Sequence, residues 1–182
     1  MATVVFVIGA CGVGKTSALA RMRPVLGPRV GEVAVIETDT VYMMIDPAWE
    51  IEDKAAYLAY TGVLTARIVG EFVHAGYDWI AVGSNGLQDR ASVDAFVELL
   101  PSGVSVHHLM LDPEIPVVQG RIARRAHPFD REKSPEWIAR NVEWMRGHLG
   151  DWNARVDNSA LTVDETVEAI YAAVRRGEGK LL

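Results

Sequence analysis

The 182-residue chain is 49% hydrophobic, and this length and composition suit one globular domain spanning residues 1–182. Its net charge of −6 argues against a general affinity for nucleic acid or for anionic membranes. A single cysteine excludes an internal disulfide, and the apolar runs are too short to span a bilayer, so we expect a cytoplasmic protein.

The first predicted element is a strand over residues 3–8, followed directly by a glycine-rich loop. The strand is apolar and β-branched, as buried parallel strands are. Residues 9–16 read Gly-Ala-Cys-Gly-Val-Gly-Lys-Thr and match the phosphate-binding loop motif Gly-x-x-x-x-Gly-Lys-Thr. Glycines let such a loop aim N–H groups at phosphate oxygens, and the positive end of the next helix adds to the anion site. The motif therefore predicts nucleoside triphosphate binding, the alternative being a turn that only links strand to helix.

Each position of the loop has an expected role. Lys15 can reach the β- and γ-phosphates as a catalytic charge, and the Thr16 hydroxyl can ligate the Mg²⁺ that bridges them. We expect ATP to contact the following residues of this segment: Gly9, Cys11, Gly12, Val13, Gly14, Lys15, Thr16 and Ser17. Cys11 is interpreted as a small filler rather than a nucleophile, although an exposed thiol there could be alkylated.

After the loop, a helix is predicted from Ser17 to Met22, ended by Pro24 and Gly27. A second strand over residues 32–36 leads into Glu-Thr-Asp-Thr at 37–40. Asp39, just past this strand, is the candidate catalytic base that accepts the proton of an acceptor hydroxyl. Its other possible role is a water-mediated Mg²⁺ contact, and the structural alternative is a helix or turn cap. Glu37 is the substitute if Asp39 points away.

A long helix is predicted over residues 53–75, and a third strand over 79–82 leads into Gly-Ser-Asn-Gly at 83–86. A helix over 88–100 follows. Ligands of parallel sheets bind beyond the carboxyl ends of the strands. We therefore expect Ser84, Asn85 and Arg90 to line the acceptor pocket, with a turn or surface role as the alternative.

The fourth predicted strand, residues 104–111, carries the alternating His107 and His108, of which we expect only one to face the core. Asp112 after it is interpreted as the N-cap of the next helix, with a metal contact as the lesser alternative. No acid ends the third strand. This absence favours a kinase, which can rely on positioning and a base near the acceptor, over a motor or switch that must activate water.

Three arginines, Arg121, Arg124 and Arg125, lie within little more than one turn of the helix after the fourth strand. Since residues i and i+4 face the same way, Arg121 can stack on adenine while Arg125 binds the transferring phosphoryl group. The alternative is a solvated basic face. A lid over about residues 121–135 would exclude water when it closes.

Three further elements complete the chain: a helix from Ser134, a short strand over 154–156, and a final helix opened by a capping box of Thr162 and Glu165. Trp137 and Trp144, seven residues apart, are expected to mark a packed helix face. Strands separated by helices predict an α/β fold with a mostly parallel sheet and helices on both faces.

The chain resembles the P-loop kinases of small molecules, which include adenylate, shikimate and gluconate kinases, chloramphenicol phosphotransferase and the zeta-toxin kinases. Residues 9–16, Asp39 and the Arg-Ile-Ala-Arg-Arg-Ala-His run at 121–127 carry this resemblance. It implies a three-layer P-loop NTPase fold with a five-stranded parallel sheet in the order 2-3-1-4-5 and an ATP–Mg²⁺ donor. It also implies an adenine bed formed by Arg121 and the loop after the last strand, which contains Asn158.

The departures narrow the function. Adenylate kinases have Asp-Gly-x-Pro-Arg after the third strand, where this chain has Gly-Ser-Asn-Gly-Leu, and the guanine motif Asn-Lys-x-Asp of GTPases is missing. The leading hypothesis is therefore ATP-dependent phosphorylation of a hydroxyl on a small metabolite, antibiotic or similar molecule. A nucleoside or nucleotide kinase is the second hypothesis, and a nucleotide-gated regulatory or binding module is the third. The acceptor and the oligomeric state do not follow from the sequence.

Overall fold

The computed structural model describes residues 1–45, 52–84, 86–125, 133–148 and 150–182. Its centre is a parallel five-stranded sheet in the order β2-β3-β1-β4-β5, which confirms the expected topology. The strands are β1 (Thr3–Ile8), β2 (Val33–Glu37), β3 (Trp79–Ser84), β4 (Ser105–Leu111) and β5 (Ala154–Val156). Because all of them run in one direction, their carboxyl ends meet at one edge of the molecule.

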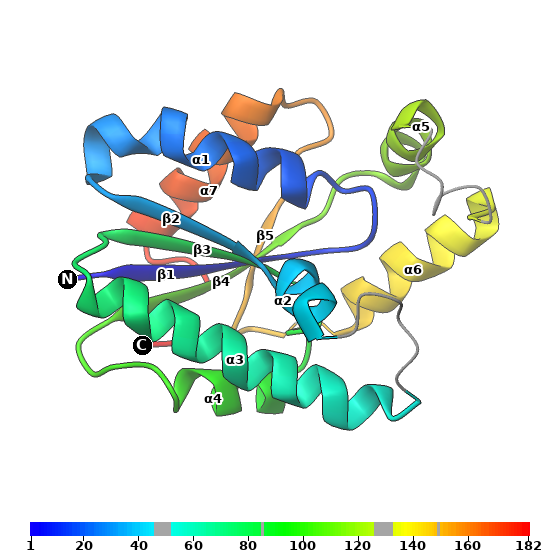
Figure 1. Cartoon of the computed structure of the whole chain (residues 1–182). Coiled ribbons are helices and arrows are strands. Elements are labelled where there is room, and N and C mark those ends of the chain that lie inside the picture. Colours follow the sequence, from blue (N-terminus) through cyan, green and yellow to red (C-terminus); the bar gives the residue numbers. More distant parts are fainter. Residues whose placement is uncertain (46–51, 85, 126–132, 149) are drawn as a thin grey trace.

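Helices cover both faces of this sheet (Figure 1). The helices are α1 (Lys15–Val30), α2 (Thr38–Ile45), α3 (Lys54–His74), α4 (Arg90–Val97), α5 (Ile115–Arg125), α6 (Pro135–Gly147) and α7 (Val163–Arg175). α1 packs with α7 over one face, and α3 packs with α4 over the other. α2, α5 and α6 lie beyond the carboxyl ends of the strands, so they border any ligand bound there.

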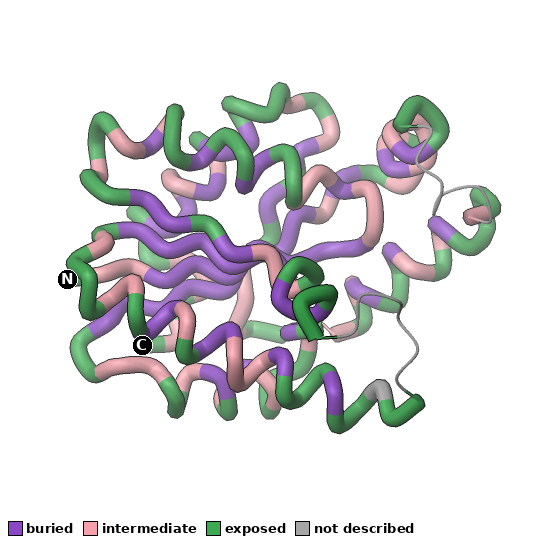
Figure 2. Tube along the Cα trace, in the orientation of Figure 1, coloured by how far each residue is buried: buried purple, intermediate pink, exposed green. Residues whose placement is uncertain are grey.

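The core follows from this three-layer arrangement, and Figure 2 shows the buried strands as its centre. Every residue of β3 and β4 is buried, because helices cover both faces of the sheet. The expectation that only one of His107 and His108 faces the core is therefore wrong, since both are buried. His107 contacts the carbonyl of Glu178 through Nδ1, and His108 contacts the carbonyl of Leu87 through Nε2.

α1 is longer than expected, because it continues through Pro24 and Pro28 to Val30. A proline inside a helix removes the hydrogen bond to the carbonyl four residues earlier. Here those carbonyls belong to Ala20 and Pro24, which are both exposed, so water can replace the missing partners. Burial of side chains on the sheet side of α1, which include Met22 and Leu26, stabilises the continued helix.

The sequence predicts the starts of α5, α6 and α7 from capping residues, and two of these three predictions are confirmed. Ser134 caps α6 by accepting the Trp137 N–H, and Thr162 with Glu165 forms the expected capping box of α7. α5, in contrast, begins only at Ile115, so Asp112 is not its N-cap. The expectation that Trp137 and Trp144 mark a packed face is also wrong, because they are 37% and 50% exposed. The buried side of α6 carries Ile138, Val142 and Met145 instead.

Residues 179–181 lie along the part of the β4 edge that the short β5 does not reach. The His108 N–H donates to the carbonyl of Gly179 at 2.8 Å, and the Leu181 N–H donates to the carbonyl of Val106 at 2.8 Å. Lys180 forms an antiparallel bridge with His107. Within the described ranges, none of the helices is both long and apolar enough to cross a membrane.

Candidate functional site

The glycine-rich loop lies at the carboxyl end of β1, in the geometry that its motif predicts. Gly9 and Gly12 have φ angles of 144° and 84°, which side-chain-bearing residues rarely adopt. A Cβ at Gly12 would lie 2.5 Å from Cγ1 of Ile122, and one at Gly9 would lie 2.7 Å from the carbonyl oxygen of Leu111. Glycine is thus required both by the backbone angles and by the close approach of α5 and of the end of β4.

Lys15 curls back over the loop. Its ammonium donates to the carbonyl of Gly9 at 2.7 Å and to that of Ala10 at 3.0 Å. Burial of the side chain lowers the pKa of Lys15 to about 8, and the neighbouring Cys11, Asp39 and Glu37 oppose this shift. The ammonium thus lies at the mouth of the loop, where an incoming phosphate can take over from the two carbonyls.

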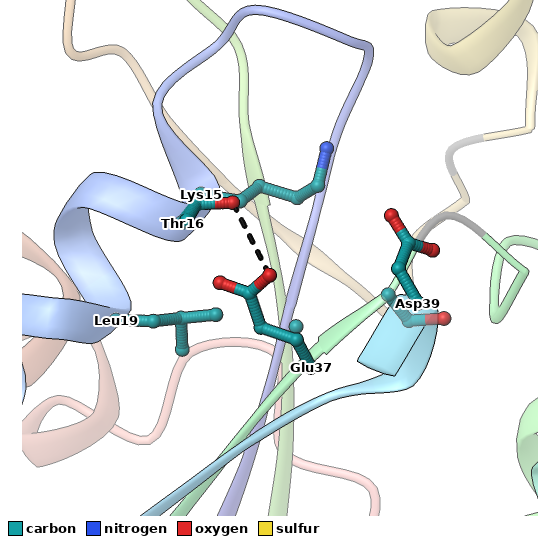
Figure 3. A pocket seen from close by; sticks show the side chains of 7 residues that line it. Lys15, Thr16, Leu19, Glu37 and Asp39 are labelled. Atoms are coloured by element: carbon teal, nitrogen blue, oxygen red, sulfur yellow. Dashed lines mark hydrogen bonds between the residues drawn. The ribbon is translucent and has the colours of Figure 1, made fainter. Parts of the chain in front are cut away.

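A small cavity opens beside Lys15, between the loop and the ends of β2 and β3 (Figure 3). It is lined by Lys15, Thr16, Leu19, Glu37, Asp39, Gly83 and Ser84. A side chain at position 83 would collide with Leu19 and approach Glu37, so the cavity depends on glycine there. Lys15 and Thr16 at the start of α1 and Asp39 of α2 surround this one cavity, although the two segments are far apart in the sequence.

Glu37 and Asp39 take different positions in the cavity. Glu37 is the last residue of β2, and the Thr16 hydroxyl donates to its Oε2 at 3.4 Å (Figure 3). Asp39 lies in the first turn of α2, with its side chain exposed toward the opening. A hydroxyl beside a carboxylate is an oxygen donor set that suits Mg²⁺, which needs few protein ligands because it keeps water and phosphate oxygens. The described residues hold no cluster of three or more His, Cys, Asp or Glu side chains that could hold a metal alone.

The residues expected to line the pocket for the acceptor molecule differ in where their side chains lie. Ser84 lines the cavity, but its hydroxyl oxygen already accepts the Thr38 hydroxyl at 3.2 Å and the Gly86 N–H at 2.9 Å. Arg90 pairs with Asp94 at 2.7 Å, and its guanidinium lies 5.8 Å from the centre of the Trp152 ring. Asn85 lies outside the described residues.

Arg121 and Asn158 meet behind the loop. The Arg121 guanidinium donates to the carbonyls of Val13 and Asn158, both at 2.8 Å, and the Asn158 amide donates to Val13 at 3.0 Å. Asn158 is 2% exposed, and its Oδ1 finds no hydrogen-bond donor among the described residues. These two residues, 37 positions apart, therefore border the same side of the loop, near Gly14.

Cys11 is the contact point between the loop and the segments on either side of 126–132, which are outside the described residues. Its sulfur accepts from Lys133 Nζ at 3.1 Å and lies 3.9 Å from a guanidinium nitrogen of Arg125. Its N–H donates to Oδ1 of Asn141 on α6 at 3.2 Å. The expected lid, residues 121–135, thus has described residues at both of its ends in contact with the loop.

Asp112 holds α6 to the sheet. Its carboxylate pairs with Arg146 of α6 at 2.6 Å and with Arg155 of β5 at 2.5 Å. The interpretation of Asp112 as a helix cap is therefore wrong, because two arginines compete for its oxygens and α5 starts three residues later. These pairs engage both oxygens, and Asp112 is not among the residues that line the cavity.

The sheet order and the glycine-rich loop together define a P-loop protein of the small-molecule kinase fold. A family model described as an AAA domain matches residues 4–150, so the chain belongs to this family. No curated protein matches the sequence.

Solved structures that share the fold include several kinases. The tunicamycin resistance protein of Deinococcus radiodurans is 18% identical, with a TM-score of 0.66 over 96% of each chain. A gluconokinase from Sinorhizobium meliloti 1021 is 20% identical, with a TM-score of 0.60 over 97% of this chain and 93% of that one. Shikimate kinase from Acinetobacter baumannii, in complex with shikimate, is 12% identical, with a TM-score of 0.64 over 97% and 95%.

The sequence does not single out two residues that lie near the loop, and it indicates a third only as an alternative. Lys133 and Asn141 approach it only through the tertiary position of α6, and no local motif marks them. Glu37 was considered only as a substitute for Asp39. Its place at the end of β2, directly before a helix start, was the available signal.

Proposed function

We propose that the protein transfers the γ-phosphoryl group of ATP to a hydroxyl group of a small molecule. The observation that carries this proposal is the single cavity in which Lys15, Thr16 and Asp39 meet at the carboxyl ends of the strands. The family and fold support a kinase-type reaction. The gluconokinase and shikimate kinase among the fold relatives are named for small hydroxyl-bearing acids, which is consistent with an alcohol as acceptor.

The donor side consists of the loop and its neighbours. Main-chain N–H groups of residues 12–17 bind the phosphates, and Lys15 leaves the carbonyls of Gly9 and Ala10 to contact the β- and γ-phosphates. Arg121 and Asn158, which meet behind Gly14, border the nucleoside. Thr16 and Glu37 would hold Mg²⁺, which neutralises charge on the phosphate oxygens when it is bound.

On the acceptor side, Asp39 takes the proton of the attacking hydroxyl. The bond between that oxygen and the γ-phosphorus forms while the bond from phosphorus to the β,γ-bridging oxygen breaks, which gives a phosphate ester and ADP. Arg125, at the mouth of the loop, stabilises charge on the phosphoryl group in transit. Residues 121–135 act as the lid that excludes water from this step.

An apolar side chain on α2 is also available for contact with the acceptor. Met43 lies one helical turn after Asp39 and on the same face of α2, and it is 49% exposed. Tyr42 and Tyr57 instead pack against each other in the core, with ring centres 4.5 Å apart. Met43 is therefore the better candidate for contact with an acceptor held beside Asp39.

Replacement of Asp39 tests the proposal. Asp39→Asn should keep nucleotide binding within about twofold but lower acceptor-dependent ADP formation by about 10²–10⁴-fold, because the amide cannot accept the hydroxyl proton. The acceptor is found first by screening hydroxyl compounds, nucleosides and nucleoside monophosphates for ADP release. Asp164→Asn, which removes an exposed carboxylate on α7, serves as the matched control. Near-full turnover in Asp39→Asn would refute the assignment of the base.

A further inference from the structure

Three cations from three segments of the chain gather at the mouth of the loop. Lys15 lies over the carbonyls of Gly9 and Ala10, and Arg125, at the end of α5, and Lys133, before α6, both approach the Cys11 sulfur. Positive side chains that converge on one loop from separate segments are typical of a site that takes an anion. The loop N–H groups and the N-terminus of α1 favour an anion at the same place.

Lys133 is held in this position by α6. It directly precedes Ser134, the N-cap, whose Oγ accepts the Trp137 N–H at 3.2 Å. The Lys133 ammonium lies 5.7 Å from the centre of the Trp137 ring, which is within the range of a cation–π contact.

One helical turn after Trp137, Oδ1 of Asn141 accepts the Cys11 N–H and fixes α6 to the loop. The capped first turn of α6 and the contact of Asn141 with Cys11 together hold the Lys133 ammonium close to the loop. It lies 3.1 Å from the sulfur of a residue inside the phosphate-binding motif.

We propose that Lys133 binds the terminal phosphate of the nucleoside triphosphate and so completes a three-cation site with Lys15 and Arg125. This inference rests on the proposed function, and it assigns to Lys133 the discrimination between a triphosphate and a diphosphate. Lys133 makes no covalent bond in this role. Its charge acts on the three outer oxygens of the phosphoryl group, which carry the negative charge during transfer.

The test compares the affinities of the protein for two nucleotides. It measures no reaction rate, so it needs no acceptor. Dissociation constants of Mg²⁺·ADP and of the Mg²⁺ complex of the non-hydrolysable β,γ-imido analogue of ATP are measured by calorimetry. Lys133→Gln should weaken the triphosphate analogue about tenfold or more and ADP less than about twofold, because a charged hydrogen bond to the terminal phosphate is lost. Lys133→Arg should recover most of the affinity for the analogue. Lys180→Gln removes the same charge from an exposed lysine beside β4 and should change neither constant.

Each other outcome overturns the inference. Equal weakening of ADP and the analogue would mean that Lys133 only holds the loop in shape, and no change in either would mean that it takes no part in binding. Melting temperatures of the variants show whether a loss of affinity comes from unfolding. If Lys133→Gln is unfolded, the affinity of Lys133→Arg for the analogue alone decides whether the inference stands. If the unmodified protein binds neither nucleotide, the proposed function itself fails. If it binds both and Lys133→Gln binds the analogue normally, only the role of Lys133 fails.

Discussion

Two carboxylates only two positions apart, at residues 37 and 39, serve different parts of the cavity. Glu37 ends β2 and faces the Thr16 hydroxyl, whereas Asp39 begins α2 and faces the opening. The change from strand to helix between them alters the direction of successive side chains. In the proposed function, this separation lets Glu37 serve the metal and Asp39 serve the acceptor.

Glu37→Gln should therefore raise the Mg²⁺ concentration needed for half-maximal activity by about tenfold, while Asp39→Asn should leave it nearly unchanged. The neutral amide keeps the hydrogen bond to Thr16 but loses the charge that attracts the cation. Activity is measured as ADP formation over a Mg²⁺ titration at saturating ATP. Identical titration curves for Glu37→Gln and the unmodified protein would contradict the metal assignment.

His108 makes the folding stability depend on pH. Its ring lies in the core between Phe6 and Trp152, and burial lowers the pKa of His108 to about 4, against an opposing hydrogen bond with the Leu87 carbonyl. The unfolded chain binds a proton near pH 6.5, so the stabilisation is complete above that pH and is lost as the pH falls toward 4. The loss attributable to this one residue amounts to about 3 kcal/mol.

His108→Phe should remove this dependence, because phenylalanine fills the ring site without titrating. The free energy of unfolding, measured with urea from pH 7 to pH 4, should fall less steeply in the variant than in the unmodified protein. The variant loses the contact to Leu87 at every pH, so only the slope is diagnostic. Parallel curves would show that His108 does not titrate on unfolding.

Between elements, α5 packs directly against the loop. Ile122 of α5 packs where a side chain at position 12 would lie, so the loop and the first half of the expected lid share one packed surface. A change at either residue should therefore disturb nucleotide binding through shape rather than charge.

Gly12→Ala should lower nucleotide affinity by about tenfold or more, since the added methyl both meets Ile122 and strains a backbone with φ of 84°. Gly62→Ala is the matched control, because nothing lies within 4 Å of its new Cβ inside α3. That control should raise the unfolding free energy by about 0.5–1 kcal/mol and leave binding intact. Calorimetry with ADP and thermal unfolding separate the two effects.

Asp112 connects α6 with β4 and β5, and its loss should be felt by the whole helix. Asp112→Ala leaves Arg146 and Arg155 without their shared carboxylate, which is 9% exposed, and should cost about 1–3 kcal/mol of stability. Asp164→Ala breaks an exposed pair with Arg21 and should cost less than about 1 kcal/mol. Equal melting temperatures for the two variants would contradict the buried role of Asp112.

At the scale of the whole molecule, local patterns in the sequence predict the sheet and the loop, because strand, glycines and capping residues act over a few positions. The alternation of strands and helices then leaves few possible topologies, and the observed order is the one that the P-loop kinases have.

What the sequence does not reveal depends on tertiary contact. Trp144 and Met145 are neighbours on one helix, yet the first is exposed and the second is buried, because the packing of α6 against its neighbours decides which side is covered. The approach of Lys133 and Asn141 to Cys11 has the same origin. The burial of both His107 and His108 likewise follows from layers on either side of β4, which the strand pattern alone does not specify.

Pairing of residues 179–181 with β4 affects how the protein is made. Because the chain is synthesised from its N-terminus, β4 leaves the ribosomal exit tunnel long before the residues that cover its outer edge. Until then the N–H groups of the central residues of β4 face water and can pair with another nascent chain. The growing polypeptide therefore exposes this part of the β4 edge until residues 179–181 have left the ribosome.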